Sequence, residues 1–294
     1  MTFIPSDEAK DFMDFKKNHD PNLSSIIEKD DEWYYNDKMY VTNSHLKHLI
    51  DGGPQHLKAY YEKDKNEKEE AHFIFGRAQH CLLFEPELFN SRFYSIDDED
   101  ICIEASGKNW KEENKSPRAT KIYKEWLAKI LQENKNRQML SPSDFMDITN
   151  MIDKLMGYSQ IREMIEAAPK RETIYSNKIM GINCKSKLDA CNPGNYILDY
   201  KSTKDPATLY KFKYVMNNYN YDRQAAFYRD VAKIPNFWFI VQEKTYPYTV
   251  CIAELSPDSY EIGKKKYEFG LEMYNKHFIK NPKEIDSYFE SGTI

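Results

Sequence analysis

The sequence predicts a single α/β or α+β domain that carries extra helices, and three features of the chain indicate this. Apolar residues recur at helical spacing through much of residues 41–167. Residues 171–201 then show the pattern of three closely joined strands, and the chain after residue 207 alternates between helix and strand. With 294 residues, the chain is long enough for one large domain.

Helices are predicted where apolar residues recur every three or four positions between capping residues and helix breakers. Leu46 and Leu49 show this spacing in a helix predicted over residues 41–50, and the Gly-Gly-Pro run that ends at Pro54 stops that helix. Residues 1–30 are polar and predict a loosely attached helix or arm. The other helices predicted in this half span residues 54–63, 71–84, a long stretch that starts at Ser141, and 158–167.

Strands are predicted from β-branched and aromatic residues between turn signals. Gly181 joins the first two strands tightly, and the Asn-Pro-Gly-Asn sequence that ends at Asn195 predicts the next turn. The predicted strands span residues 171–180, 182–190, 196–201, 236–243 and 248–254, with helices over 207–232 and from Ser256 to about 276.

Composition excludes several classes of protein. No apolar run approaches the roughly 20 residues that a membrane span needs, so we expect no integral membrane protein. The N-terminal residues lack a basic region followed by an apolar core, so we expect a cytoplasmic location. The five cysteines are scattered without a CxxC pair, which argues against zinc knuckles and iron–sulfur clusters and favours free thiols.

Charge leaves nucleic acid open as a partner, because binding depends on a local patch and not on the formal net charge of −5. Residues 104–137 carry nine basic and five acidic side chains. This stretch is either an ordinary charged helix surface or a basic wall that faces a phosphate backbone.

The strand that contains Asp199-Tyr200-Lys201 holds the chemistry-bearing residues. Alternate side chains of a strand share a face, so Asp199 and Lys201 point the same way. The short turn brings Asp189 onto the neighbouring strand, where its carboxylate could meet that of Asp199. Two converging carboxylates suit Mg²⁺ or Mn²⁺, and a lysine beside them can orient or deprotonate water or stabilise developing phosphorane charge. The pattern predicts phosphodiester hydrolysis.

An acid followed two residues later by lysine is a weak signal, because it occurs elsewhere in this chain and is also typical of a cross-strand surface pair. Its context strengthens the functional interpretation. Glu172 stands at the start of the preceding strand, and Gln224 and Tyr228 share a face of a later helix because they are four residues apart.

These residues, together with Gly76-Arg-Ala-Gln-His80, resemble the PD-(D/E)XK nuclease superfamily over most of the chain. The pattern is most similar to the RecB-type branch and to phage or prophage exonucleases of the RecE (exodeoxyribonuclease VIII) type. The resemblance implies a restriction-endonuclease-like core, with a central mixed sheet flanked by helices and a helical N-terminal region. It also implies a single nuclease domain over residues 1–294, with N-terminal helical decoration in 1–70 and the catalytic core in 71–294.

The resemblance further implies roles for individual residues. Lys201 would be the catalytic lysine, and Gln224 and Tyr228 would touch the substrate strand at the rim of the site. Mg²⁺, with Mn²⁺ as a possible substitute, would be the cofactor. For His80, the alternative is a buried histidine of a helix that has no metal role. The implied metal ligands are His80, Glu172, Asp189, Asp199 and the backbone carbonyl of Tyr200.

As a function, the resemblance implies a DNA exonuclease that degrades one strand of linear duplex DNA, 5′ to 3′. Such enzymes form homo-oligomeric rings on double-stranded DNA ends and work with a single-strand annealing protein in phage-type recombination. Two alternatives remain: an endonuclease or defence nuclease on the same fold, and a catalytically silent DNA-binding or interaction protein. Neither GxGxxG nor GxxxxGK[ST] occurs, which argues against hydride transfer and nucleotide hydrolysis.

Overall fold

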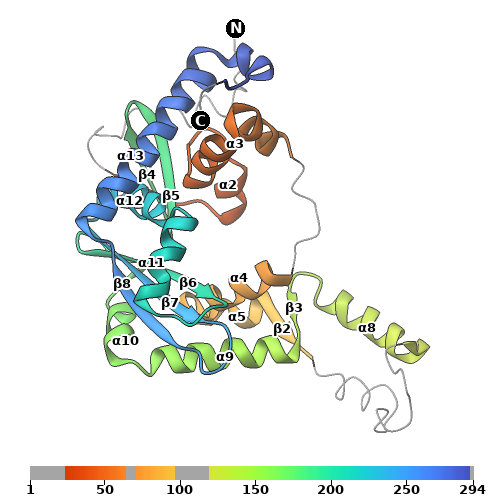
Figure 1. Ribbon diagram of the computed structural model, residues 1–294. Helices are drawn as coiled ribbons and strands as arrows, with labels where there is room; N and C mark the ends of the chain where they lie inside the picture. Colours follow the sequence, from red (N-terminus) through yellow and green to blue (C-terminus); the bar gives the residue numbers. More distant parts are fainter. Residues whose placement is uncertain (1–23, 64–70, 97–118, 292–294) are drawn as a thin grey trace.

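A mixed six-stranded sheet forms the centre of the computed structural model, which describes residues 24–63, 71–96 and 119–291 (Figure 1). The strand order is β1-β4-β5-β6-β7-β8, and neighbours are antiparallel except for the parallel pair β6 and β7. The predicted mixed α/β fold is therefore confirmed. The strands are β1 (Ser25–Ile27), β4 (Lys170–Ile179), β5 (Ile182–Asn192), β6 (Tyr196–Thr203), β7 (Asn236–Glu243) and β8 (Val250–Glu254).

Helices surround this sheet, and a small parallel pair, β2 (Phe93–Ser95) and β3 (Gln138–Leu140), lies apart from it. The helices are α2 (Asp31–Asn36), α3 (Asn43–Glu62), α4 (Ala71–Phe84), α5 (Pro86–Arg92), α8 (Lys121–Glu133), α9 (Pro142–Met156), α10 (Ser159–Glu166), α11 (Leu209–Asn218), α12 (Tyr221–Ala232) and α13 (Pro257–Tyr274). A π-helical segment (Asn275–Lys280) and a 3-10 helix (Pro282–Ser287) follow α13.

Three predicted elements differ in the structure, two for a local backbone reason and one because of a distant strand pairing. The helices predicted over 41–50 and 54–63 form one element, α3, which kinks where Gly53 has a φ of 79°. The single helix predicted over 207–232 is two helices, because Asn220 adopts the left-handed conformation between α11 and α12. The helix or arm predicted for residues 1–30 contains strand β1, which pairs with β4.

Parts of some predictions lie outside the described residues. These are residues 1–23 of the N-terminal arm and residues 104–118 of the lysine-rich stretch. The division into 1–70 and 71–294 remains a prediction, to which the structure adds that β1 extends the central sheet. Among the described helices, none is both long and apolar enough to cross a membrane.

Apolar side chains cover both faces of the sheet, because successive residues of each strand point to opposite sides. Ile197 and Phe239 pack into one core with residues of α12 and α13, whereas Leu198 and Ile240 pack into a second core with residues of α9 and α10. The sheet is thus the middle layer between two groups of helices (Figure 1).

The segment before α3 is fastened to β5 around a fully buried lysine. Val41 forms a bridge with Cys184, and the ammonium of Lys185 lies 2.8 Å from an Asp37 carboxylate oxygen. The same ammonium lies 4.2 Å from the Trp33 ring centroid and 5.0 Å from that of Tyr34. A buried charge needs such a partner, so this ion pair and its aromatic surroundings fix residues 33–41 against the sheet.

Helix α13 holds α12 at both of its ends. Lys266 Nζ lies 2.7 Å from Asp222 Oδ2 at the start of α12, and the hydroxyls of Tyr260 and Tyr267 both donate to Asp230 near its end. The two helices approach so closely that a Cβ on Gly263 would overlap the backbone carbonyl of Asp222. Glycine is therefore the residue that this crossing accommodates.

The Gly263→Ala variant should be destabilised by about 2 kcal/mol or more, because backbone and not a flexible side chain blocks the new methyl group. Thermal unfolding should show a melting temperature lower by roughly 4–8 °C. Gly76→Ala is the matched control, since a Cβ there meets nothing within 4 Å. That variant should be neutral or more stable by up to about 1 kcal/mol. An equal loss in both variants would contradict the packing argument.

Candidate active site

The candidate site lies where β5 and β6 separate. Their paired residues run from Asn192 and Tyr196 to Ala190 and Leu198, and the pairing ends there. Asp189 and Asp199 are the next residue on each strand, so they face the opening of this fork. Tyr200 lies beyond the last paired residues, so no β5 carbonyl accepts its backbone N–H, which instead donates to Asp189 Oδ2 at 2.8 Å. The carboxylate thus takes the place of a strand-pairing acceptor.

Glu172 reaches the same place from β4 through an unusual backbone conformation. The pairing between β4 and β5 is interrupted at Glu172, whose φ of 47° is in the left-handed region. A non-glycine residue there costs free energy, and such strain concentrates at functional sites. Ligand atoms of His80, Glu172 and Asp189 all lie within 4.8 Å of one another. His80, from α4, places Nδ1 3.5 Å from Asp189 Oδ2.

Asp199 is buried and is held by two other residues. Its Oδ2 lies 2.7 Å from Lys201 Nζ, and its Oδ1 accepts a hydrogen bond of 3.1 Å from Gln224 Nε2 on α12. Despite the short distance to Lys201, Oδ2 makes no aligned hydrogen bond with the described residues. An incompletely satisfied, buried carboxylate oxygen at this position suits a metal ion.

Lys201 is an ammonium group at neutral pH. Burial alone would lower its pKa, but Asp199 and Asp189 raise the pKa above its ordinary value. The ammonium also lies 5.0 Å from the centroid of the Tyr221 ring. Lys201 can therefore stabilise negative charge and orient water, and the raised pKa does not suit it to removing a proton.

Burial affects the acidic groups in the opposite sense. It raises the pKa of Asp199 to about 6, with Lys201 opposing the shift and Asp189 adding to it. Burial also raises the pKa of Glu172, where Asp189 adds to the shift, and the pKa of Asp189, where Lys201 opposes it. Burial lowers the pKa of His80, which favours the neutral imidazole that binds metals.

The charges of the site are unequal. Lys187 Nζ lies 2.7 Å from Glu172 and 2.6 Å from Asp31, while Lys201 pairs with Asp199. Together with Asp189, these groups comprise four carboxylates and two ammonium groups. The excess is two negative charges, which one divalent cation would neutralise. His80, Glu172 and Asp189, with Asp199 alongside, therefore fit a hard divalent metal ion such as Mg²⁺ or Mn²⁺.

The structure brings most of the predicted residues to this place. Tyr228 lies one turn after Gln224 on α12 and is partly buried. Burial raises its pKa well above the ordinary value, and the nearby Tyr34, Asp199 and Asp189 add to the shift. The ring of Tyr200 instead packs in the second core, and its hydroxyl donates to Gln242 at 2.9 Å. The metal role of the Tyr200 carbonyl remains a prediction.

The sequence assigned no role in the site to three of its residues. Strand alternation does place Lys187 on the same face as Asp189, which follows two positions later, but it does not predict the ion pair of Lys187 with Glu172. Tyr221 directly begins the helix that carries Gln224, but nothing local marks its contact with Lys201. Asp31 is 156 residues from Lys187, so no spacing pattern could have joined the two.

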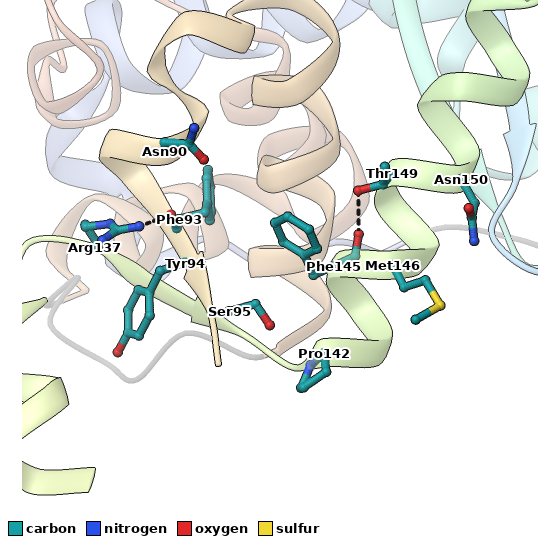
Figure 2. Close-up of a pocket in the computed structure, with 10 residues that line it drawn as sticks. All are labelled: Asn90, Phe93, Tyr94, Ser95, Arg137, Pro142, Phe145, Met146, Thr149 and Asn150. Carbon is teal, nitrogen blue, oxygen red and sulfur yellow. Dashed lines mark hydrogen bonds between the residues drawn. The ribbon is translucent and has the colours of Figure 1, made fainter. Parts of the chain in front are cut away.

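A cavity of about 560 Å³ lies elsewhere, between the β2 and β3 region and α9 (Figure 2). Among the described residues, one charged side chain lines it, that of Arg137, which donates to Asn134 and to the backbone carbonyl of Phe93 and lies over the Tyr94 ring. None of the predicted site residues lines this cavity. The described residues of its lining therefore offer no acid–base pair for hydrolysis.

Comparison with known proteins agrees with the fold. A family model described as a PDDEXK-like domain of unknown function (DUF3799) matches residues 42–286, which is more than half of the chain. The chain therefore belongs to this PDDEXK-like family. It is also similar to the crystal structure of a "putative exonuclease" from Eubacterium rectale, with a TM-score of 0.55 and 12% identity over 90% of this chain and 89% of that chain. At that identity the likeness shows the shared fold alone. No curated protein gives a significant match.

Binding of Mn²⁺ should weaken about tenfold between pH 7.5 and pH 5. Only about a tenth of a carboxyl group with a pKa near 6 is ionised at pH 5, and metal ligands must be deprotonated. Isothermal titration calorimetry at several pH values measures this change. Carboxylates with ordinary pKa values would stay mostly ionised at pH 5. A change in Mn²⁺ affinity of less than twofold would therefore contradict a metal site that contains Asp199.

Proposed function

We propose that this chain is a Mg²⁺-dependent deoxyribonuclease that hydrolyses phosphodiester bonds of linear double-stranded DNA from an end. The observation that supports this most is the convergence of His80, Glu172 and Asp189 at the β5–β6 fork, beside the Asp199–Lys201 pair. Membership of a PDDEXK-like family and a fold shared with the Eubacterium rectale protein support the same class.

Each residue then has a definable task. Glu172, Asp189 and His80 would hold the metal ion, with Asp199 at its side. When bound, the ion would neutralise the scissile phosphate and stabilise the departing 3′-oxygen. The Lys201 ammonium would orient the attacking water and offset negative charge that develops on the phosphate. Gln224 fixes the Asp199 carboxylate from α12, which keeps the acid and the lysine in one geometry.

The resemblance of the sequence motifs supports three finer parts of this proposal. These are 5′-to-3′ polarity, assembly of several copies into a ring around a DNA end, and cooperation with a single-strand annealing protein in phage-type recombination. The proposal places the protein and its reaction in the cytoplasm. Each part can fail without affecting metal-dependent hydrolysis itself.

The deciding experiment is digestion of linear, 5′-labelled duplex DNA and of closed circular DNA in Mg²⁺ or in EDTA. The wild-type protein should degrade only the linear DNA and only with Mg²⁺. Lys201→Ala should reduce the rate at least about a hundredfold, because charge stabilisation at the phosphate is lost. Lys178→Ala, which removes an exposed lysine of β4, is the control and should keep wild-type activity.

Other outcomes would redirect the proposal. Cleavage of the closed circle would indicate an endonuclease or a defence nuclease. No metal-dependent cleavage by folded protein would indicate a DNA-binding or interaction protein. A Lys201→Ala protein with full activity would remove Lys201 from the chemistry.

A further inference from the structure

Helix α11 presents aromatic rings to solvent next to the candidate active site. Tyr210, Tyr214 and Tyr219 are 73%, 57% and 63% exposed. Tyr210 and Tyr214 are four residues apart, so they share one face of the helix, and their rings meet edge to face at 5.2 Å. Exposure of three large aromatic side chains on such a short segment calls for an explanation beyond packing.

Basic side chains flank this aromatic face. At 100° per residue, Lys211 and Lys213 project to either side of the stripe that Tyr210 and Tyr214 form. The helix contains no acidic residue, and both lysines are exposed. Asp205, just before the helix, approaches Lys211 at 3.5 Å, but both side chains are largely in water, where such a pair holds weakly.

The C-terminal end of α11, where Tyr219 follows the helix, is connected to Lys201 through stacked rings. Tyr219 stacks on Tyr221 with centroids 5.7 Å apart, and Lys201 Nζ lies 5.0 Å from the Tyr221 centroid. On its inner side, Tyr221 also stacks on the buried Phe212 of α11, with centroids 6.3 Å apart. The packing of α11 therefore places its outer face at a fixed position relative to Lys201.

We propose that Tyr210, Tyr214 and Tyr219, with Lys211 and Lys213, form a binding track for single-stranded nucleic acid that leads to the Asp199–Lys201 site. Bases stack on aromatic rings without regard to sequence, and lysines beside the rings follow the phosphates. This inference rests on the proposed nuclease function, because it names the path by which one strand approaches that site. A protein partner would have less use for paired lysines on both sides of the rings.

The test measures binding of a fluorescein-labelled single-stranded 20-nucleotide DNA to the full chain in EDTA, by fluorescence anisotropy. The double variant Tyr210→Ala/Tyr214→Ala should bind at least about tenfold more weakly, and Tyr219→Ala at least about fivefold, in the range expected when a base loses its stacking partner. Tyr210→Phe/Tyr214→Phe keeps the rings and should stay within about twofold of wild type. Phe269→Ala, which removes an exposed ring of α13, is the control and should bind as wild type does.

Salt dependence tests the lysines separately. If both contact phosphates, Lys211→Gln/Lys213→Gln should reduce the slope of log affinity against log salt by about 1.4. An unchanged slope would remove the lysines from the track and overturn the inference as stated.

Two further measurements separate this inference from others. Equal binding by the double alanine variant and Phe269→Ala would overturn the track, even if the wild-type protein cleaves linear DNA. Light scattering compares the molecular mass of the wild-type protein with that of Tyr210→Ala/Tyr214→Ala. If the mass differs while the affinity for the single strand stays the same, the inference is overturned, because the aromatic face would then join copies of the chain. If the wild-type protein cleaves no DNA but the alanine variants lose strand binding, the result supports the binding track and contradicts the proposed nuclease function.

Discussion

The end of pairing between β5 and β6 is the constraint on which the rest of the site depends. While two antiparallel strands stay paired, their backbone groups satisfy each other; where they diverge, other groups must do so. After Ala190 and Leu198, the Tyr200 N–H turns to the Asp189 carboxylate, and Asp199 turns to Lys201 and Gln224. The end of the pairing thus positions Asp189 and Asp199 on neighbouring strands at the same place.

The site holds several carboxylates close together, although their negative charges repel one another. Burial raises the pKa of Glu172, Asp189 and Asp199, and Glu172 also holds an unfavourable φ. The surrounding layers must oppose these costs. Helix α12 supplies Gln224 and is itself fixed by α13, so the geometry around Asp199 depends on a helix crossing whose closest point is Gly263. Packing and electrostatics are therefore coupled on the face of the sheet that α12 and α13 cover.

The sequence predicted those features that short-range patterns encode. Alternation and the turn at Gly181 predicted β4 and β5 almost to the residue, and strand periodicity predicted that Asp199 and Lys201 share a face, at a distance the structure shows to be 2.7 Å. Features set by distant contacts could not be predicted. Strand β1 exists because β4 offers it a paired edge, and the Asp31–Lys187 pair joins residues 156 positions apart. The left-handed Glu172 has no local signal at all.

The buried pair of Lys185 and Asp37 has a consequence for how related sequences can diverge. Loss of either member leaves the other charge buried without compensation, which typically costs 3–5 kcal/mol, whereas joint replacement by apolar residues of similar volume is often neutral. The rings of Trp33 and Tyr34 already provide an apolar surface for such a replacement. Among homologues, positions 37 and 185 should therefore change together, which makes this pair a marker for aligning N-terminal segments whose sequences have otherwise diverged.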